Sequence, residues 1–245
     1  MIRGINYFVR KFEKYPCCVV GMKGRGKDLI FGNVAVRRNK PYISNLDYTQ
    51  RKNYIPLYFE SLDLSCAKWT DFIDGTLPHY EFPYPIESDV YISDVGVYLP
   101  SQYCNEINKK YPHIATYMAL SRQVSHNRVH INTQNLNRCY DKIREQSDLY
   151  FWCERCIYIP KLNIVIQRIF EYDKPSSCQD RVKPARIRVP LFNKEARMQA
   201  EVYLDKFRNT YGSIKSHLVI YRNKSKHDTY YFEKAFKNGV KKEND

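Results

Sequence analysis

A glycine-rich loop that ends in a lysine lies near the N-terminus. It follows a short apolar run, Cys17–Val20, and precedes a helix candidate at Asp28–Arg38. Glycines let consecutive backbone N–H groups converge on phosphate oxygens, the first turn of a helix adds partial positive charge, and a lysine reaches the β- and γ-phosphates. A glycine turn lined with basic residues is the simpler alternative. The pattern favours a nucleotide-binding loop formed by Gly21, Met22, Lys23, Gly24, Arg25, Gly26, Lys27, Asp28 and Leu29.

The last part of this loop departs from the usual pattern. A hydroxyl residue normally follows the lysine and contacts Mg²⁺, but here the residue is Asp28. A P-loop enzyme also needs an apolar strand that ends in acids, one for the Mg²⁺ shell and one that polarises the attacking water. Val90–Ile92, followed by Ser93 and Asp94, is the best candidate for this strand. We therefore predict ATP and Mg²⁺ as cofactors and Asp94 as the water-polarising acid.

A third polar element is expected at the tip of a neighbouring strand. The strand candidate Arg128–Thr133 is followed by Gln134, which we predict to face the γ-phosphate, although a capping or loop role is an open alternative. Arg122 and Arg144 flank this strand. Either is a candidate arginine finger, and a structural salt bridge is the alternative for both.

The order of the elements predicts an α/β fold. Short strands alternate with helical segments, which is typical of a mostly parallel sheet with helices on both faces, the P-loop NTPase architecture. The alternation stops after Tyr172. We expect a P-loop ATPase domain over residues 1–172 and a small basic α+β extension over residues 173–245, packed on or beside it. Pro175–Pro184 is interpreted as a linker, and Lys194–Tyr211 as an amphipathic helix that ends at Gly212.

Composition narrows the partners and the compartment. The 245 residues carry a formal net charge of +14, concentrated after Arg181, which predicts a polyanionic partner, first nucleic acid and then an anionic membrane surface. No window approaches a continuous apolar span, and the start resembles no signal peptide, so we expect the cytoplasm and no membrane span. Cys153 and Cys156 lie three apart on a strand candidate. Alternation would put them on opposite faces, which favours buried thiols over a metal site.

These motifs, taken in order, resemble the Zot-like family of zonular occludens toxin and filamentous-phage assembly ATPases, part of the FtsK–HerA class of P-loop motors. The similarity covers about Tyr15 to Tyr158. It rests on the glycine loop at Gly21–Lys27, a strand ending in Asn at Lys40–Leu46, an acidic strand followed by a proline at Ile92–Pro100, the stretch Ala119–Gln134, and the helix at Arg138–Asp148.

The departures from the family pattern are reciprocal. Counted back from Pro100, Ser93 stands where the family has Asp, and Asp94 stands where it has Glu. The loop has Asp28 where Ser or Thr belongs. We hypothesise an exchange that keeps one hydroxyl and one carboxylate in the same metal shell, with Asp28 as the Mg²⁺ ligand and Ser93 as its hydrogen-bond partner. Asp28 near phosphates is repulsive unless a metal lies between them, so nucleotide affinity should depend strongly on Mg²⁺.

The resemblance implies a phage-encoded ATPase that moves or packages single-stranded DNA during virion assembly. It also implies a homo-oligomeric ring, contact with phage assembly or membrane proteins, and a place in the cytoplasm of the bacterial host, peripheral to the inner membrane if it docks there. Two alternatives remain open. One is a nucleic-acid-binding protein with a degenerate, slow or inactive P-loop, and the other is a nucleotide kinase.

Overall fold

A computed structural model describes most of the chain. The described residues are 1–46, 48, 53–57, 68–70, 79–81, 88–110, 114, 117, 121, 128–187 and 193–225. Arg122, a predicted arginine finger, lies outside them. Among the described residues, no helix is both long and apolar enough to cross a membrane.

Nine of the described strands form one sheet in the order β1-β11-β10-β9-β2-β8-β7-β3-β4, and β5 (Lys68–Thr70) pairs with β6 (His79–Glu81) apart from it. The nine strands are β1 (Ile2–Arg3), β2 (Cys17–Val20), β3 (Tyr42–Ser44), β4 (Tyr54–Pro56), β7 (Asp89–Ile92), β8 (Arg128–Thr133), β9 (Leu149–Ile159), β10 (Ile164–Tyr172) and β11 (Ile214–Arg222).

The direction of the strands places the site. From β4 to β9 all neighbours are parallel, so the carboxyl ends of β2, β8, β7 and β3 lie at one edge of the sheet. β8 lies between β2, which leads into the glycine loop, and β7, which leads into the acids. Polar groups at the end of β8 therefore lie between the loop and the acids. β10 runs antiparallel to both of its neighbours, β9 and β11.

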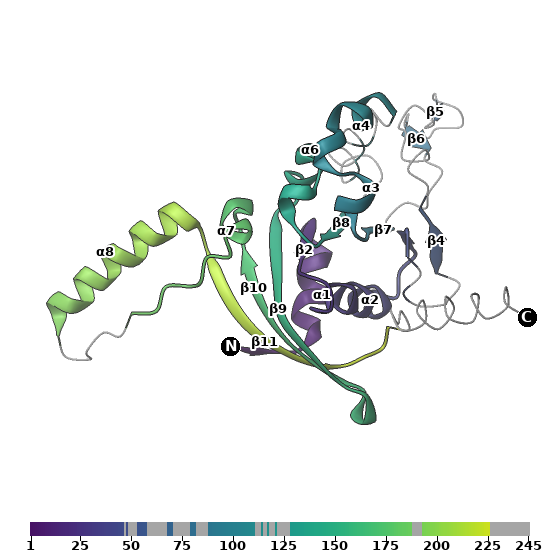
Figure 1. Cartoon of the computed structure of the whole chain (residues 1–245). Helices are drawn as coiled ribbons and strands as arrows, with labels where there is room; N and C mark the ends of the chain where they lie inside the picture. Colours follow the sequence, from purple (N-terminus) through teal and green to yellow (C-terminus); the bar gives the residue numbers. More distant parts are fainter. Residues whose placement is uncertain are drawn as a thin grey trace, which may run out of the picture.

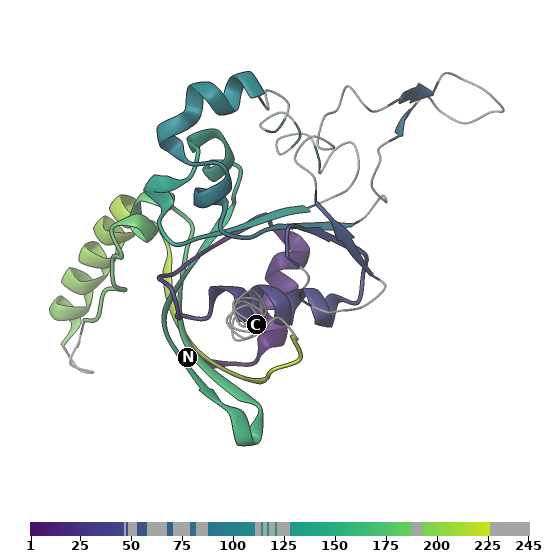
Figure 2. The same ribbon diagram turned by 45° about the vertical axis from the view of Figure 1, so that its right-hand side comes forward.

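Helices cover the sheet on two sides (Figures 1 and 2). α1 and α2 pack on one face, over a core that contains Phe8, Phe12, Phe31 and Phe151. The shorter helices pack on the other face, around Ile92, Ile131 and Tyr150. The helices are α1 (Ile5–Lys14), α2 (Lys27–Arg38), α3 (Val95–Tyr98), α4 (Cys104–Lys110), α6 (Asp141–Arg144), α7 (Pro175–Gln179) and α8 (Lys194–Tyr211), with 3-10 turns η3 (Ser101–Tyr103), η4 (Leu136–Arg138) and η5 (Pro160–Leu162). The α/β prediction of a mostly parallel sheet with helices on both faces is confirmed.

The C-terminal quarter shares the main sheet. β11 pairs with β10 along its whole length, and β1 at the other end of the chain pairs with β11. The predicted division at residue 172 stays a prediction. A chain that ended there would lack β11, which lies between β10 and β1 in the sheet. The predicted linker Pro175–Pro184 is wrong in part, because its first half is helix α7. There Ser177 and Cys178 are buried against β9 and β10. The predicted helix Lys194–Tyr211 is confirmed, and Gly212 ends it at φ +74°.

The argument that separates Cys153 from Cys156 is wrong. The register of β9 against β10 shifts between Arg168 and Ile169, so that Glu154 is an extra residue. Such a bulge adds one residue to the alternation and brings the two cysteines to the same face. Both pack in the core beneath α2, and burial raises the pKa of each thiol. Cys153 is therefore buried and Cys156 half-buried, both as free thiols.

A buried ionic cluster joins α1 and β11 to β10. Glu171 accepts hydrogen bonds from the hydroxyl of Tyr7 at 2.5 Å and bonds to Nε2 of His217 at 3.0 Å. Lys11 and Lys215 pair with its other oxygen, at 3.2 and 3.5 Å. Burial alone would raise the pKa of Glu171. The hydrogen bonds and the lysines outweigh burial and lower that pKa to about 2.

Replacing this carboxylate should weaken the fold in a pH-dependent way. The pKa of Glu171 is lower in the folded state, so its contribution is complete above the unfolded value of 4.5 and is lost as pH falls toward about 2. Glu171→Gln should lower the free energy of unfolding at pH 7 by about 3 kcal/mol. Denaturant unfolding from pH 7 to pH 2.5 should show the difference from wild type shrinking as pH falls. A constant difference would contradict the assignment.

Candidate nucleotide-binding site

The glycine loop has the backbone that a phosphate site requires. Gly24 and Gly26 lie at φ +75° and +77°, a region that L-residues rarely adopt, and Gly26 is the N-cap of α2. A Cβ on Gly21 would lie 3.0 Å from Cβ of Cys153. The loop between β2 and α2 therefore needs these glycines for its shape and for its close contact with β9. The N-terminus of α2 opens toward the carboxyl edge of the sheet, as the sequence predicts.

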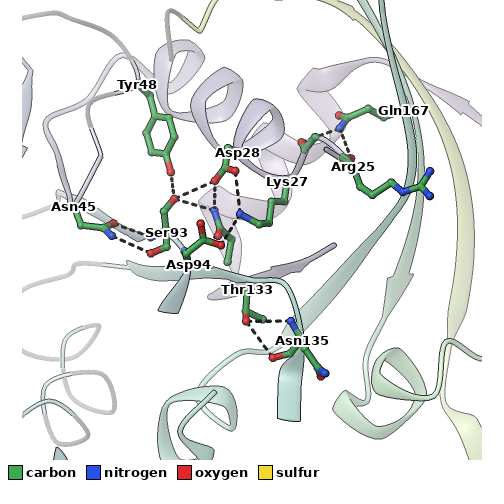
Figure 3. Close-up of polar contacts among 12 residues, drawn as sticks. Arg25, Lys27, Asp28, Asn45, Tyr48, Ser93, Asp94, Thr133, Asn135 and Gln167 are labelled. Atoms are coloured by element: carbon green, nitrogen blue, oxygen red, sulfur yellow. Dashed lines mark hydrogen bonds and ion pairs between the residues drawn. The ribbon is translucent and has the colours of Figure 1, made fainter. Parts of the chain in front are cut away.

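β10 fixes the loop from the side. Nε2 of Gln167 donates to the carbonyl of Gly26 at 2.8 Å and lies 3.4 Å from the carbonyl of Arg25 (Figure 3). The hydroxyl of Tyr221 on β11 donates to Oε1 of Gln167 at 2.6 Å. Two loop carbonyls are therefore held by one side chain of β10. No sequence pattern indicates this role of Gln167, which lies 141 positions after Gly26.

Lys27 is buried between two carboxylates. Its ammonium lies 3.0 Å from Oδ2 of Asp28 and 2.6 Å from Oδ1 of Asp94 (Figure 3). Burial favours the neutral amine, but the charges of Asp28 and Asp94 outweigh it and raise the pKa of Lys27. The loop lysine is therefore charged, and the acid after β7 lies directly beside it. Asp94 itself adopts a left-handed backbone at φ +49°, which directs the chain sharply into α3.

The residues of the predicted exchange meet in space. Oγ of Ser93 lies 3.4 Å from Oδ1 of Asp28, although 65 positions separate them in the sequence. Asn132, inside β8, joins both: its Nδ2 donates to Oδ1 of Asp28 and to Oγ of Ser93, each at 2.9 Å. Its Oδ1 accepts from the backbone N–H of Asp94 at 2.8 Å. One amide thus connects the loop, the end of β7 and β8.

Two further residues support Ser93. Asn45, just after β3, accepts from the backbone N–H of Ser93 at 2.7 Å and donates to its carbonyl at 2.9 Å. The hydroxyl of Tyr48 lies against Oγ of Ser93 (Figure 3). Burial raises the pKa of Tyr48 well above its usual value, with a further contribution from the charge of Asp28. Tyr48 therefore stays a neutral phenol.

Three polar groups surround the hydroxyl of Ser93. A hydroxyl has one proton and two lone pairs. When Ser93 donates a hydrogen bond to Asp28, the amide of Asn132 and the hydroxyl of Tyr48 occupy both of its lone pairs. Ser93 therefore contacts Asp28, and its predicted role beside the metal stays a prediction. The other oxygen of Asp28 pairs with Lys27 at 3.0 Å.

The donor set fits a magnesium ion. Mg²⁺ in proteins binds one or two carboxylates and takes its other ligands from substrate phosphates and water. Asp28 supplies one carboxylate for the metal, and it already pairs with a cation, the ammonium of Lys27, which Asp94 contacts from the other side. Within the described ranges there is no cluster of three or more His, Cys, Asp or Glu side chains that would form a metal cage. These residues therefore suit a metal that arrives with a nucleotide.

The remaining predicted residues differ in position. Gln134 lies one residue beyond β8 and is exposed, while Asn132 on the same strand is the β8 residue that contacts the acids. The role of Gln134 stays a prediction. Arg144 on α6 pairs with Asp141 at 3.1 Å, as the salt-bridge alternative describes. Asn132 is a polar residue within the strand candidate Arg128–Thr133, and this pattern could have identified it from the sequence.

Comparisons with known proteins add the following. No model of a known protein family matches the sequence. No curated protein matches it either. Among solved structures, the N-terminal domain of zonular occludens toxin from Neisseria meningitidis is similar with a TM-score of 0.41 and 14% identity, over 75% of this chain and 97% of that one. The genome packaging NTPase B204 from Sulfolobus turreted icosahedral virus 2, crystallised with AMPPCP, is similar with a TM-score of 0.40 and 16% identity, over 66% of this chain and 93% of that one.

One of these two similar structures, the zonular occludens toxin domain, carries the name of the family that the motifs resemble. Likeness at these TM-scores and identities is too broad to carry a conclusion about activity. The chemistry of this chain follows from the contacts around Lys27.

The reciprocal exchange can be tested by reversing it. Asp28→Ser leaves Lys27 with one carboxylate, and Ser93→Asp adds a carboxylate beside Asp28, so each single change should weaken Mg²⁺–ATP binding by about tenfold or more. The double variant restores one hydroxyl and one carboxylate and should recover most of the affinity, with a coupling of about 1–3 kcal/mol. Calorimetry measures the dissociation constants.

Two controls accompany this cycle. Ser176→Asp, an exposed serine on α7, should leave ATP binding unchanged. Wild type titrated with ATP in EDTA should bind much more weakly than with Mg²⁺. Additive losses in the double variant, or equal affinity with and without the metal, would exclude the exchange.

Proposed function

We propose that this chain is a P-loop ATPase. The observation that carries the proposal is Lys27, a charged loop lysine held between Asp28 and the strand-end acid Asp94 at the N-terminus of α2. A merely structural glycine turn has no need for a buried lysine surrounded by acids from two separate elements. Burying a lysine is costly unless it is paired, so the folded chain maintains this arrangement with specific partners.

Each residue has a place in hydrolysis. The N–H groups of the loop and of the first turn of α2 bind the phosphate oxygens. Lys27 leaves its carboxylate partners and neutralises the β- and γ-phosphates. Asp94 accepts a proton from water, whose oxygen attacks the γ-phosphorus while the bond to the β–γ bridging oxygen breaks. Asp28 would hold a Mg²⁺ ion, which would supply additional positive charge to the phosphates.

Asn132 positions these groups. It holds Asp28 by one oxygen, bonds Ser93, and fixes the backbone at Asp94. A displacement of either acid would therefore displace the other through Asn132. Asp94 is one methylene shorter than the Glu of the family pattern, and slow turnover follows if this shorter acid reaches the water less well.

Within this class we propose a phage-assembly motor that acts on single-stranded DNA. The support is the Zot-like motif order and the net charge of +14, most of it after Arg181. A polyanion is the natural partner of such a chain. We further propose that it works in the bacterial host cell as a homo-oligomer, with phage assembly proteins as neighbours.

A nucleic-acid-binding protein with an inactive P-loop is the second candidate. The aspartate in the hydroxyl position of the loop favours it, because an acid there repels phosphate when no metal is bound. The two functions differ in turnover and not in DNA binding, so they can be separated in one set of assays.

Loss of Lys27 should abolish turnover. Lys27→Ala removes the charge that neutralises the transferred phosphoryl group, and steady-state kcat should fall by about 100-fold or more. Lys142→Ala, an exposed lysine on α6, is the matched control and should behave as wild type. Equal turnover in the two variants, or no turnover in wild type, would contradict the ATPase. The second candidate, a nucleic-acid-binding protein with an inactive P-loop, would then be favoured.

Single-stranded DNA should bind with strong salt dependence. If basic residues contact the phosphates, log K should fall linearly with log salt concentration, by about 0.7 per phosphate neutralised. Fluorescence anisotropy with a labelled oligonucleotide measures this slope, and ATPase assays show whether the DNA raises kcat. A salt-independent affinity, or stimulation by any polyanion, would contradict a DNA motor.

A further inference from the structure

Aliphatic side chains line one face of the hairpin β9–β10 and of the neighbouring strands β11 and β1. The pairing register places them in adjacent rows across the strands, and Ile157, Ile166 and Ile220 form the middle row. This face is opposite to the one that carries α1 and α2. Each of the side chains is at least partly exposed. We call them together the aliphatic face, which consists of Ile2, Ile157, Ile159, Ile164, Ile166, Leu218 and Ile220.

The cover on this side of the sheet ends before it reaches the aliphatic face. α7 packs on β9 and β10, and the ammonium of Lys183 lies 4.2 Å from the centre of the buried ring of Phe170. Further along the same strands, Ile157 and Ile220 are 43% and 42% exposed, and the hairpin turn projects past α1 and α2 (Figures 1 and 2). Sheets of α/β folds are usually covered on both faces. An exposed aliphatic surface of this kind therefore indicates contact with another apolar phase.

The rim of the aliphatic face is positively charged. Residues 154–168 contain one acid, Glu154, and residues 214–222 contain none. Glu154 is already neutralised twice, by Arg168 at 3.1 Å and by Lys183. No further acid of these two stretches is present to balance the other cations at the rim, which are Arg155 beside Arg168, Lys161 in the hairpin turn, and Arg222 at the end of β11.

Aliphatic side chains with a cationic rim suit an anionic lipid bilayer better than a nucleic acid. On a bilayer, basic side chains are attracted to the anionic headgroups while apolar side chains enter the boundary with the acyl chains. Single-stranded nucleic acids bind instead to surfaces where aromatic side chains stack on the bases. The aliphatic face has no aromatic residue, so a nucleic acid would contact its rim and leave its isoleucines in water.

We propose that the aliphatic face docks directly on an anionic lipid bilayer. Its isoleucines enter the interface, and Arg155 and Arg222 contact lipid phosphates at the rim. Leu162, which is 61% exposed at the hairpin turn, extends the apolar contact. The contact is with the lipid itself and requires neither a nucleotide nor a membrane protein. The bilayer lies on the reverse side of β10, whose inward residue Gln167 holds the glycine loop.

Cosedimentation of the full chain with lipid vesicles, in the absence of nucleotide, tests the proposal independently of ATPase activity. Wild type should bind vesicles of phosphatidylcholine mixed with phosphatidylglycerol at least about tenfold more tightly than vesicles of pure phosphatidylcholine. Ile157→Asp and Ile220→Asp should each weaken this binding by about tenfold or more, because the new carboxylate resists removal from water. Val97→Asp, at a 68% exposed aliphatic position on α3, is the matched control and should bind as wild type does.

A fluorescent reporter distinguishes insertion into the bilayer from a loss of folding. After subtraction of the wild-type signal, the emission of Leu162→Trp should move to shorter wavelength when anionic vesicles are added. Lipids brominated in their acyl chains should quench it. Val97→Trp should show neither change, because α3 lies away from the hairpin (Figure 1).

Three results would overturn the proposal. The first is wild type that does not bind anionic vesicles, or binds pure phosphatidylcholine equally well. The second is binding that Ile157→Asp and Ile220→Asp leave unchanged, or quenching of Val97→Trp equal to that of Leu162→Trp. The third is a loss in these two aspartate variants of affinity for a labelled single-stranded oligonucleotide and not for vesicles, which would assign the face to nucleic acid.

Discussion

The site depends on one buried positive charge and the groups that compensate it. Lys27 is 5% exposed, and a lysine is retained in such a position only when anions surround it. Its two carboxylates come from the first turn of α2 and from the end of β7, so the pairing holds the helix and the strand in a fixed relation. Asn132 extends this relation to β8, since it bonds Asp28 and the backbone of Asp94 together. The glycine loop, the acid and the polar strand residue are consequently a single unit.

The sheet is built so that this unit is held from behind. β10 and β11 are remote from the phosphate side, but Gln167 on β10 reaches the loop carbonyls and Tyr221 on β11 fixes Gln167. The buried cluster around Glu171 joins the same two strands to α1. The C-terminal strand is therefore part of the support of the candidate nucleotide site.

Several features were predictable because they depend on local patterns. The glycine loop, the apolar strands and the helix that ends at Gly212 can be recognised from residues that are neighbours in the sequence, and the structure confirms them. The bulge at Glu154 was not predictable, because it arises from the register with β10 and not from the sequence of β9 alone. α7 was not predicted for a similar reason: its proline and two serines suggest a linker, and its helix is stabilised by burial of Cys178 against the sheet.

The sequence by itself determined the glycine turn between a strand and a helix, and the residue types at Asp28 and Ser93 on which the predicted exchange rests. Motif spacing is enough for that, because a strand, a glycine turn and a helix start are contiguous in the chain. Only the tertiary structure decided that these residues touch, that Asn132 rather than Gln134 joins them, and that Tyr48 and Asn45 orient Ser93. The physical reason is that these contacts connect the ends of four parallel strands, and strand order across a sheet brings together side chains whose distance along the chain gives no sign of it.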